Sequence, residues 1–261
     1  MLKKSNEQLK ANIEKNLKGN YDIHIFDEIK STNTTLKEMA EAGAKEGTII
    51  IAHKQTEGRG TQGRKFHSPL NGLYISLLVR PNVDIQKSLY ITVATAVAVV
   101  NAIRKVLGIK CGIKWVNDII YRNKKVGGIL TEGEIESSSN SLKYAVVGIG
   151  LNLSKPKGGF SKDIVDIATT LLERDISETE YCKIVAEMVN IAFKLYRNLN
   201  KKTFIKKYQT YSVLKKKEIK YAKNGEIHIG KVLRIDNNAK LIVKENKEKI
   251  KLCAGEVSLI K

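Results

Sequence analysis

Residues 58–65 read Gly58-Arg59-Gly60-Thr61-Gln62-Gly63-Arg64-Lys65 and follow a β-branched run, residues 48–52, that predicts a buried strand. Glycine adopts positive φ angles and lets backbone N–H groups approach a ligand closely. Consecutive N–H groups in such a turn form a concave anion site, and arginine adds bidentate donors beside it. This stretch, the basic loop, therefore predicts a site for a phosphate or a carboxylate. A solvated basic turn is the alternative from these residues alone.

The glycine spacing matches the G-x-G-x-x-G pattern of dinucleotide-binding folds, but the surrounding sequence does not. That fold needs a helix at the third glycine and an acidic residue about 20 positions later. Residues 66–72 instead contain Ser-Pro and Asn-Gly, which are turn signals. No V-A-I-K, H-R-D or D-F-G element of a protein kinase follows either. Both readings of the glycine pattern are therefore rejected.

The composition is that of a folded protein of 261 residues, 42% of them hydrophobic. No uninterrupted apolar run approaches the roughly 18 residues of a membrane span, and no apolar signal core follows the first lysines. The cysteines at 111, 182 and 253 are odd in number and scattered, which disfavours a disulfide framework or a zinc site. We therefore expect a cytoplasmic protein with reduced thiols, no membrane association and no metal bound by protein ligands.

The net charge of +19 raises the question of nucleic-acid binding. Nine lysines lie between Lys201 and Lys223 against one acid, Glu218, but aromatic and aliphatic residues recur among them, as on amphipathic elements. The segment before the first predicted strand, residues 1–20, is too short for a helix-turn-helix domain. We therefore expect no DNA binding, whereas the same charge would steer an acidic protein partner.

Hydrophobic periodicity and turn signals predict a mixed region followed by strands alone. A short helical lead-in is expected over 1–20, and helices over 35–42, 85–107, 163–172 and 179–198. Strands are expected over 21–26, 48–52, 73–79 and 145–153, with a hairpin within 114–132 that turns at 122–124. Five short strands follow at 217–221, 226–235, 240–244, 248–252 and 256–260, which is typical of a small barrel or sandwich.

Capping signals place the predicted helix ends. Thr35 and Glu38 form a capping box for helix 35–42, and Gly43 lies where that helix should stop. Asp84 and Gly108 bound helix 85–107 in the same way. The change of texture after Ser212 predicts a catalytic domain over 1–211 and a second domain over 212–261.

Polar residues interrupt apolar surroundings at three further places. Ser31-Thr32-Asn33 precede a predicted helix, Asn117-Asp118 lie in a strand-like run, and Asn152 ends one. Lys125 begins the return strand of the hairpin, and Gly127-Gly128 allow close approach. Buried polar groups need partners, so each set either caps a turn or binds a ligand.

Taken together, these groups resemble bacterial biotin–protein ligases (biotin–[acetyl-CoA carboxylase] ligases). The resemblance runs from about residue 26 to residue 261. It rests on Ser31-Thr32-Asn33, residues 55–64, Ser68-Pro69, Lys114-Trp115 with Asn117-Asp118, Lys125 with Gly128-Ile129-Leu130, residues 148–152 and Gly255-Glu256-Val257. It implies an α+β fold: a mixed β-sheet catalytic domain backed by helices, plus a small C-terminal SH3-like β-barrel.

The resemblance also implies a reaction, in which biotin and ATP give biotinyl-5′-AMP and the biotinyl group passes to a lysine of a biotin carboxyl carrier protein. Arg59 and Lys125 would neutralise the anions, and Asp118 would orient or deprotonate the lysine amine. Mg²⁺ would be held mainly by phosphate oxygens. Homodimer formation is left open. The implied biotin contacts are Ser31, Thr32, Asn33, Gln55, Gly58, Arg59, Gly60, Thr61, Lys125 and Gly128, and the implied ATP contacts are Arg64, Asn117, Lys125 and Asn152.

Three positions depart from the family pattern. Val116 replaces a proline and Phe66 a tryptophan, changes that we expect to be tolerated. Thr61 stands where many members carry an arginine beside the acyl phosphate. Threonine brings no charge, so a charge-assisted contact of roughly 1.5–3 kcal/mol would be missing, and we expect the adenylate to be held less tightly.

Two alternatives share parts of this pattern. A lipoate–protein ligase has the same catalytic fold and adenylate chemistry, but Ser31-Thr32-Asn33 with Gln55 suit the polar ureido ring of biotin better. A biotin-responsive DNA-binding regulator would need a groove-reading module, for which residues 1–20 are too few.

Overall fold

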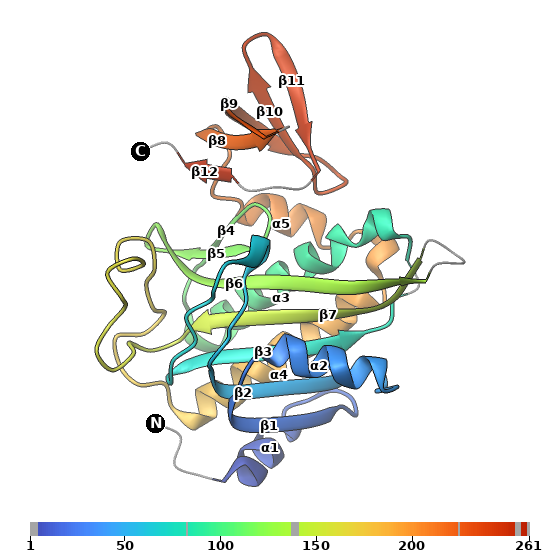
Figure 1. Cartoon of the computed structure of the whole chain (residues 1–261), viewed down its shortest axis with the longest axis vertical. Coiled ribbons are helices and arrows are strands. Elements are labelled where there is room, and N and C mark those ends of the chain that lie inside the picture. Colours follow the sequence, from blue (N-terminus) through green and yellow to red (C-terminus); the bar gives the residue numbers. More distant parts are fainter. Residues whose placement is uncertain (1–4, 82, 137–140, 224, 254–256, 260–261) are drawn as a thin grey trace.

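The computed structural model describes residues 5–81, 83–136, 141–223, 225–253 and 257–259 and confirms an α+β fold with a mixed sheet. The larger sheet has seven strands in the order β1-β2-β3-β7-β6-β5-β4 (Figure 1). β1 pairs parallel to β2 and the other neighbours pair antiparallel. The strands are β1 (Asp22–Ile29), β2 (Thr48–Gln55), β3 (Gly72–Val79), β4 (Gly112–Lys114), β5 (Asp118–Tyr121), β6 (Lys124–Glu136) and β7 (Ser141–Asn152).

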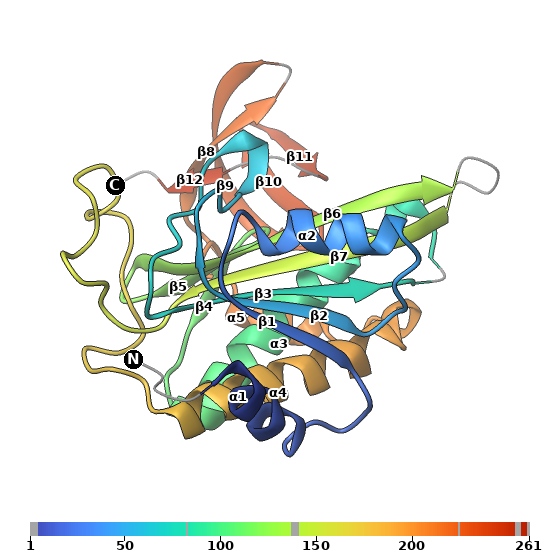
Figure 2. The same ribbon diagram turned by 60° about the horizontal axis from the view of Figure 1, so that its bottom comes forward.

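Helices cover both faces of this sheet. α1 (Asn6–Glu14), α3 (Leu89–Leu107) and α4 (Glu178–Tyr196) lie on one face, and α2 (Thr32–Glu41) lies on the other (Figure 2). α3 is long and apolar enough to span a membrane by length and composition, but it is mostly buried in the core, as expected for an interior helix. The side chain of Leu36 on α2 packs with Ile50 and Leu78 of the sheet in a smaller cluster on the opposite face.

The C-terminal strands form a second, five-stranded antiparallel sheet in the order β11-β10-β9-β8-β12. They are β8 (Glu218–Lys223), β9 (Glu226–Ile235), β10 (Leu241–Glu245), β11 (Glu248–Leu252) and β12 (Val257–Leu259), close to the predicted ranges. Trp115 Nε1 donates to the carbonyl of Ala239 at 2.9 Å, which ties this sheet to the larger one. The boundary at residue 212 and the SH3-like barrel remain predictions.

The helix predicted over 163–172 is wrong, because this segment forms turns over 162–167 and then an extended stretch. Its first part forms turns, such as the bond from Ala168 N to the carbonyl of Ile164 at 2.8 Å, and other backbone groups of the segment pair with the ends of β6 and β7. Lys125 N donates to the carbonyl of Ile167 at 2.8 Å, and Thr169 N donates back to Lys125 at 2.9 Å. Leu171 N donates to the carbonyl of Asn152 at 3.0 Å. The strand ends therefore satisfy polar backbone groups that a helix would have satisfied internally.

The predicted capping box of Thr35 and Glu38 is also wrong, because α2 begins at Thr32. The side chain of Ser31 accepts from Thr34 N at 3.5 Å and is the true N-cap, so that Thr32 and Asn33 lie within the first helical turn. Gly43, with φ of 96°, follows the helix as predicted.

Asp84 does not cap the long core helix. A 3₁₀ turn, Ile85–Lys87, comes first and α3 starts at Leu89, whereas Gly108 ends it in the left-handed region as predicted. A short helix, α5 (Ile205–Tyr211), lies in the lysine-rich stretch where no helix was expected.

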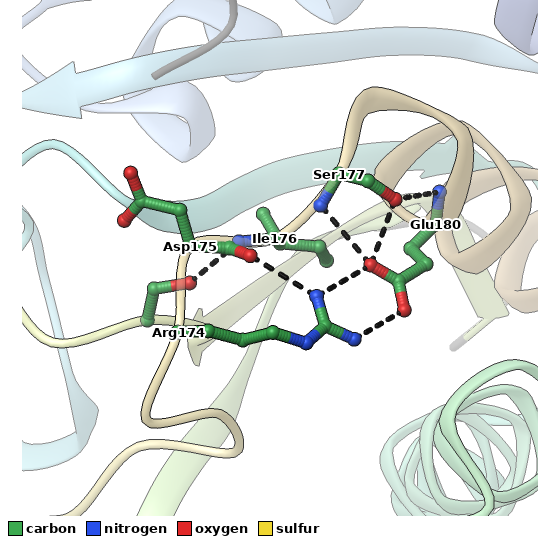
Figure 3. A network of polar contacts seen from close by, with 6 residues as sticks. Arg174, Asp175, Ile176, Ser177 and Glu180 are labelled. Atoms are coloured by element: carbon green, nitrogen blue, oxygen red, sulfur yellow. Dashed lines mark hydrogen bonds and ion pairs between the residues drawn. The ribbon is translucent and has the colours of Figure 1, made fainter.

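The N-terminus of α4 is fixed by a capping box (Figure 3). Ser177 Oγ accepts from Glu180 N at 3.3 Å, and Glu180 Oε2 accepts from Ser177 N at 3.0 Å. Arg174 donates to both oxygens of Glu180 at 2.9 and 2.6 Å. The bonds from Arg174 and then Ser177 lower the pKa of Glu180 to about 2.

Replacing this carboxylate should remove a pH-dependent contribution to stability. Because the folded pKa is depressed, ionised Glu180 stabilises the protein above its unfolded pKa of about 4.3, and the contribution is lost as pH falls toward about 2. Glu180→Gln should lower the free energy of unfolding by about 0.5–1 kcal/mol at pH 7. Urea unfolding between pH 7 and 3 measures this, with the exposed Glu38→Gln as control. A difference from wild type that stays constant over this range would contradict the assignment.

Candidate functional site

Two glycines of β7, Gly148 and Gly150, form part of the floor of a cavity on the sheet face that α2 covers. A Cβ atom at Gly148 would lie 2.1 Å from Asn33 Oδ1, and one at Gly150 would lie 2.5 Å from the ring of Phe66. The side chains of Asn33 on α2 and of Phe66, just after the basic loop, can therefore lie directly on the strands. The cavity has a volume of about 480 Å³, open solvent included, and is lined by Ser31, Thr32, Asn33, Gln55, Arg59, Gly60, Thr61, Phe66, Asn117, Lys125, Gly128, Ile129, Leu130, Gly148, Ile149 and Gly150.

One wall of the cavity is a set of linked polar groups around Gln55. Gln55 Oε1 accepts from the backbone N and from Oγ1 of Thr32 at 2.8 and 3.1 Å, and Nε2 donates to Ser68 Oγ at 2.9 Å. Thr32 and Ser68 are both 4% exposed. Buried polar groups hold their geometry only when they are paired, so this wall is fixed before any ligand arrives.

The same network continues across the sheet to the basic loop. Ser76 Oγ lies 2.8 Å from Thr32 Oγ1 and 2.6 Å from Asn33 Oδ1. Asn33 Nδ2 donates to Glu132 Oε2 at 2.8 Å, and Glu132 Oε1 pairs with Arg59 at 3.0 Å. Sequence reasoning assigned no role to Ser76 or Glu132. Ser76 was detectable as a polar residue inside an apolar run. Glu132 was detectable because it lies four residues after Gly128, and side chains an even number of residues apart in a strand face the same side of the sheet.

The basic loop closes on itself over the cavity. Phe66 N donates to the carbonyl of Gly58 at 2.8 Å, and Gly60 N donates to that of Arg64 at 2.7 Å. A Cβ at Gly58 would lie 2.4 Å from both Phe66 O and Ser68 Oγ. Gly58 is thus buried at the base of the loop and, unlike the other predicted biotin contacts, is not among the residues lining the cavity.

Lys125 reaches the cavity because β6 carries a β-bulge. The register shift opposite Ile119 and Ile120 adds one residue to β6, so that Lys125 and Gly128 face the same side of the sheet. Lys125 Nζ lies 2.5 Å from Asp118 Oδ1, and Lys114 Nζ lies 3.6 Å from Asp118 Oδ2. Two ammonium groups therefore share one carboxylate at this end of the cavity.

A second cavity adjoins the first and shares five lining residues with it, among them Lys125, Asn117 and Phe66. It has a volume of about 1650 Å³, open solvent included, and Arg64, Asp118 and Asn152 also line it. The remaining lining residues are Gly60, Thr61, Gln62, Lys65, His67, Leu89, Lys114, Trp115, Val116, Phe160, Ile164, Ile167, Ala168 and Val257. The structure thus gathers every predicted ATP contact at one site, and the segment mistaken for a helix supplies part of its wall.

The turn that carries Asn117 is anchored from both sides. Asn117 Nδ2 donates to the carbonyl of Ile129 at 2.8 Å. Tyr208 OH donates to the carbonyl of Val116 at 2.8 Å. Burial, together with the nearby charge of Asp118, raises the pKa of Tyr208 well above its ordinary value. Tyr208 therefore remains a neutral donor at physiological pH.

Residues 25–152 match the biotin/lipoate A/B protein ligase family. The chain aligns over 98% of its length with the bifunctional ligase/repressor BirA of Bacillus subtilis, at 31% identity. The alignment covers 79% of that relative. The chain belongs to the biotin/lipoate A/B protein ligase family. It is also 27% identical, over 64% of its length, to the biotin–[acetyl-CoA-carboxylase] ligase of Mycobacterium tuberculosis, and it covers 61% of that relative.

Solved structures of this family have the same fold. The biotin protein ligase of Aquifex aeolicus in complex with biotin and ATP superposes with a TM-score of 0.75 at 26% identity, covering 92% of this chain and 99% of that one. The Leishmania major enzyme with biotinyl-5-AMP, at 22% identity and a TM-score of 0.57, supports the fold alone. The chain is accordingly a ligase of the α+β type that its sequence predicts.

Substitutions at Gly148 and Asn33 test whether the Asn33 side chain is the reason that position 148 must be glycine. Gly148→Ala should lower the free energy of unfolding by about 1–3 kcal/mol, because the new Cβ overlaps Asn33 Oδ1. In an Asn33→Ala background that atom is gone, so the same substitution should cost less than about 1 kcal/mol. Urea unfolding of the four proteins measures the coupling. Equal costs in both backgrounds would show that Gly148 is not required by the Asn33 side chain.

Proposed function

We propose that this ligase activates biotin with ATP to biotinyl-5′-AMP and transfers the biotinyl group to a lysine of a biotin carboxyl carrier protein. The observation that supports this most strongly is the pair of adjoining cavities that share Lys125. The smaller, polar cavity suits the ring of biotin, and the larger suits a nucleotide. A reaction between the two substrates would then take place where the cavities meet.

The polar wall suits the head group of biotin. The ureido ring carries one carbonyl acceptor and two N–H donors, which need a complementary set of fixed partners. Ser31 and Thr32 offer hydroxyls, and Gln55 holds Thr32 in place through its carbonyl oxygen. Asn33 is 4% exposed and oriented by Ser76 and Glu132. A site built for hydrogen bonding disfavours a ring that lacks these groups, because its own polar atoms would stay unpaired.

Cations would make the first step possible. A biotin carboxylate oxygen attacks the α-phosphorus of ATP, and the bond from that phosphorus to pyrophosphate breaks. Both reactants are anions, so they repel each other strongly in a partly desolvated site. Lys125 and Arg59 line the cavity and would offset this repulsion and the charge that develops on the phosphate. Asn117, Asn152 and Arg64 would hold the nucleotide.

In the second step, a carrier lysine amine attacks the acyl carbon and AMP leaves with the bonding electrons. Only a neutral amine is nucleophilic, so the arriving ammonium must lose a proton. Asp118 lies beside Lys125 where the two cavities join and is the candidate to orient the amine or accept that proton.

Magnesium would enter this site with the nucleotide. Within the part of the chain that the structure describes, no group of three or more His, Cys, Asp or Glu side chains is placed to hold a metal ion. Triphosphate oxygens are the ligands that Mg²⁺ prefers in such sites, so the ion would neutralise the phosphates while Lys125 neutralises the carboxylate. A cytoplasmic location and the absence of DNA binding remain predictions, and homodimer formation stays open.

Biotin-dependent exchange of labelled pyrophosphate into ATP tests the first step. Wild type should exchange, and Arg59→Ala and Lys125→Ala should each lower the rate at least about a hundredfold, a loss of roughly 2.7 kcal/mol of transition-state stabilisation. Lys143→Ala removes an exposed lysine paired with Glu134 on the same sheet and should leave the rate unchanged. No exchange above a biotin-free control, from folded wild type, would contradict the proposed function.

Measuring adenylate formation and biotinyl transfer separately tests whether Asp118 acts in the second step. Asp118→Asn should lower the rate of transfer from isolated biotinyl-5′-AMP to a carrier domain by about tenfold or more, since only that step needs a neutral amine. Adenylate formation should fall less. Equal losses in both steps would mean that Asp118 serves only to hold Lys125.

A further inference from the structure

Glu132 contacts two residues that line the cavity, Asn33 and Arg59, without being among the lining residues itself. It lies on β6 on the same face as Gly128 and Leu130. One carboxylate oxygen accepts from Asn33 at 2.8 Å, and the other pairs with the guanidinium of Arg59 at 3.0 Å. The side chain is 28% exposed, so the pair is partly shielded from water.

We infer that Glu132 is the positioning residue for Arg59: it fixes the guanidinium, and with it the basic loop, across the biotin cavity. This inference rests on the proposed function and adds a residue to it. Arg59 is 51% exposed, and an arginine side chain in solvent samples many rotamers unless a partner selects one. The carboxylate of Glu132 supplies that partner from the rigid strand below the loop.

Fixing Arg59 in this way leaves it able to bind a ligand. A guanidinium has five N–H donors in a planar fork, and the Glu132 pair engages one nitrogen at 3.0 Å. The remaining donors can face a carboxylate or an acyl phosphate while Glu132 keeps the group oriented. Preorganised donors stabilise a bound anion more than mobile ones, because their ordering cost is met before binding.

The backbone bonds of the loop run from its base to its tip and fix its own shape. Gly58 and Phe66 close the base, and Gly60 bonds to Arg64 within the loop. The Arg59 pair instead reaches across the cavity to the sheet. Since Glu132 also holds Asn33, one carboxylate couples closure of the loop to the orientation of the head-group wall.

Glu132→Gln isolates the charge. Glutamine keeps the shape and an oxygen that can accept from Asn33, but it loses the ion pair with Arg59. We expect a 3–10-fold rise in the Kd for biotin, about what loss of one partly exposed ion pair produces, with a faster dissociation rate in stopped flow. The unfolding midpoint should stay unchanged. Glu134→Gln, two residues along the same strand and paired with Lys143, is the matched control.

A double-mutant cycle shows whether the effect passes through Arg59. In an Arg59→Ala background, Glu132→Gln should change the Kd for biotin by less than twofold, because the residue it positions is absent. An unchanged Kd for Glu132→Gln alone, or the same loss in both backgrounds, would overturn the inference. Wild type that binds no biotin would instead sink the proposed function, so the two failures are distinguishable.

Discussion

The buried amide of Asn33 is the contact on which the rest of the site depends. Its oxygen lies 2.6 Å from Ser76 Oγ, and its nitrogen donates to Glu132 at 2.8 Å. An unpaired buried amide would be costly, so these bonds fix how closely α2 approaches the sheet. Only glycine at position 148 leaves room for the amide. Helix, sheet and basic loop are thereby joined at one point.

A second constraint is the placement of charge. The chain carries a net charge of +19, yet the cations nearest the reaction centre are matched by carboxylates, Lys125 by Asp118 and Arg59 by Glu132. Paired cations are held in defined positions, and an arriving anion can share them without their first having to be ordered. The overall positive field would draw in anionic substrates and an acidic carrier, whereas the pairs determine geometry.

Sequence reasoning located the strands and the site motifs because the signals for both are local. The β-branched run at 48–52 and the apolar run at 73–79 became β2 and β3, and the polar motifs beside them converged on adjoining cavities. It failed where tertiary contacts decide. Residues 163–172 have helical composition, but the ends of β6 and β7 capture their backbone. The bulge that turns Lys125 toward Asp118, and the pairing of Glu132 with Arg59, likewise depend on register across strands that no local pattern encodes.

We propose that the preset polar wall recognises the ring of biotin through its hydrogen-bonding groups. Calorimetric titration of the purified protein with biotin and with lipoate tests it most directly, since both ligands end in a carboxylate on an aliphatic chain and differ in the ring. We expect biotin to bind and lipoate to bind at least about a hundredfold more weakly, because a dithiolane ring leaves the polar groups of the wall unpaired. Equal affinity for the two, or preference for lipoate, would contradict it.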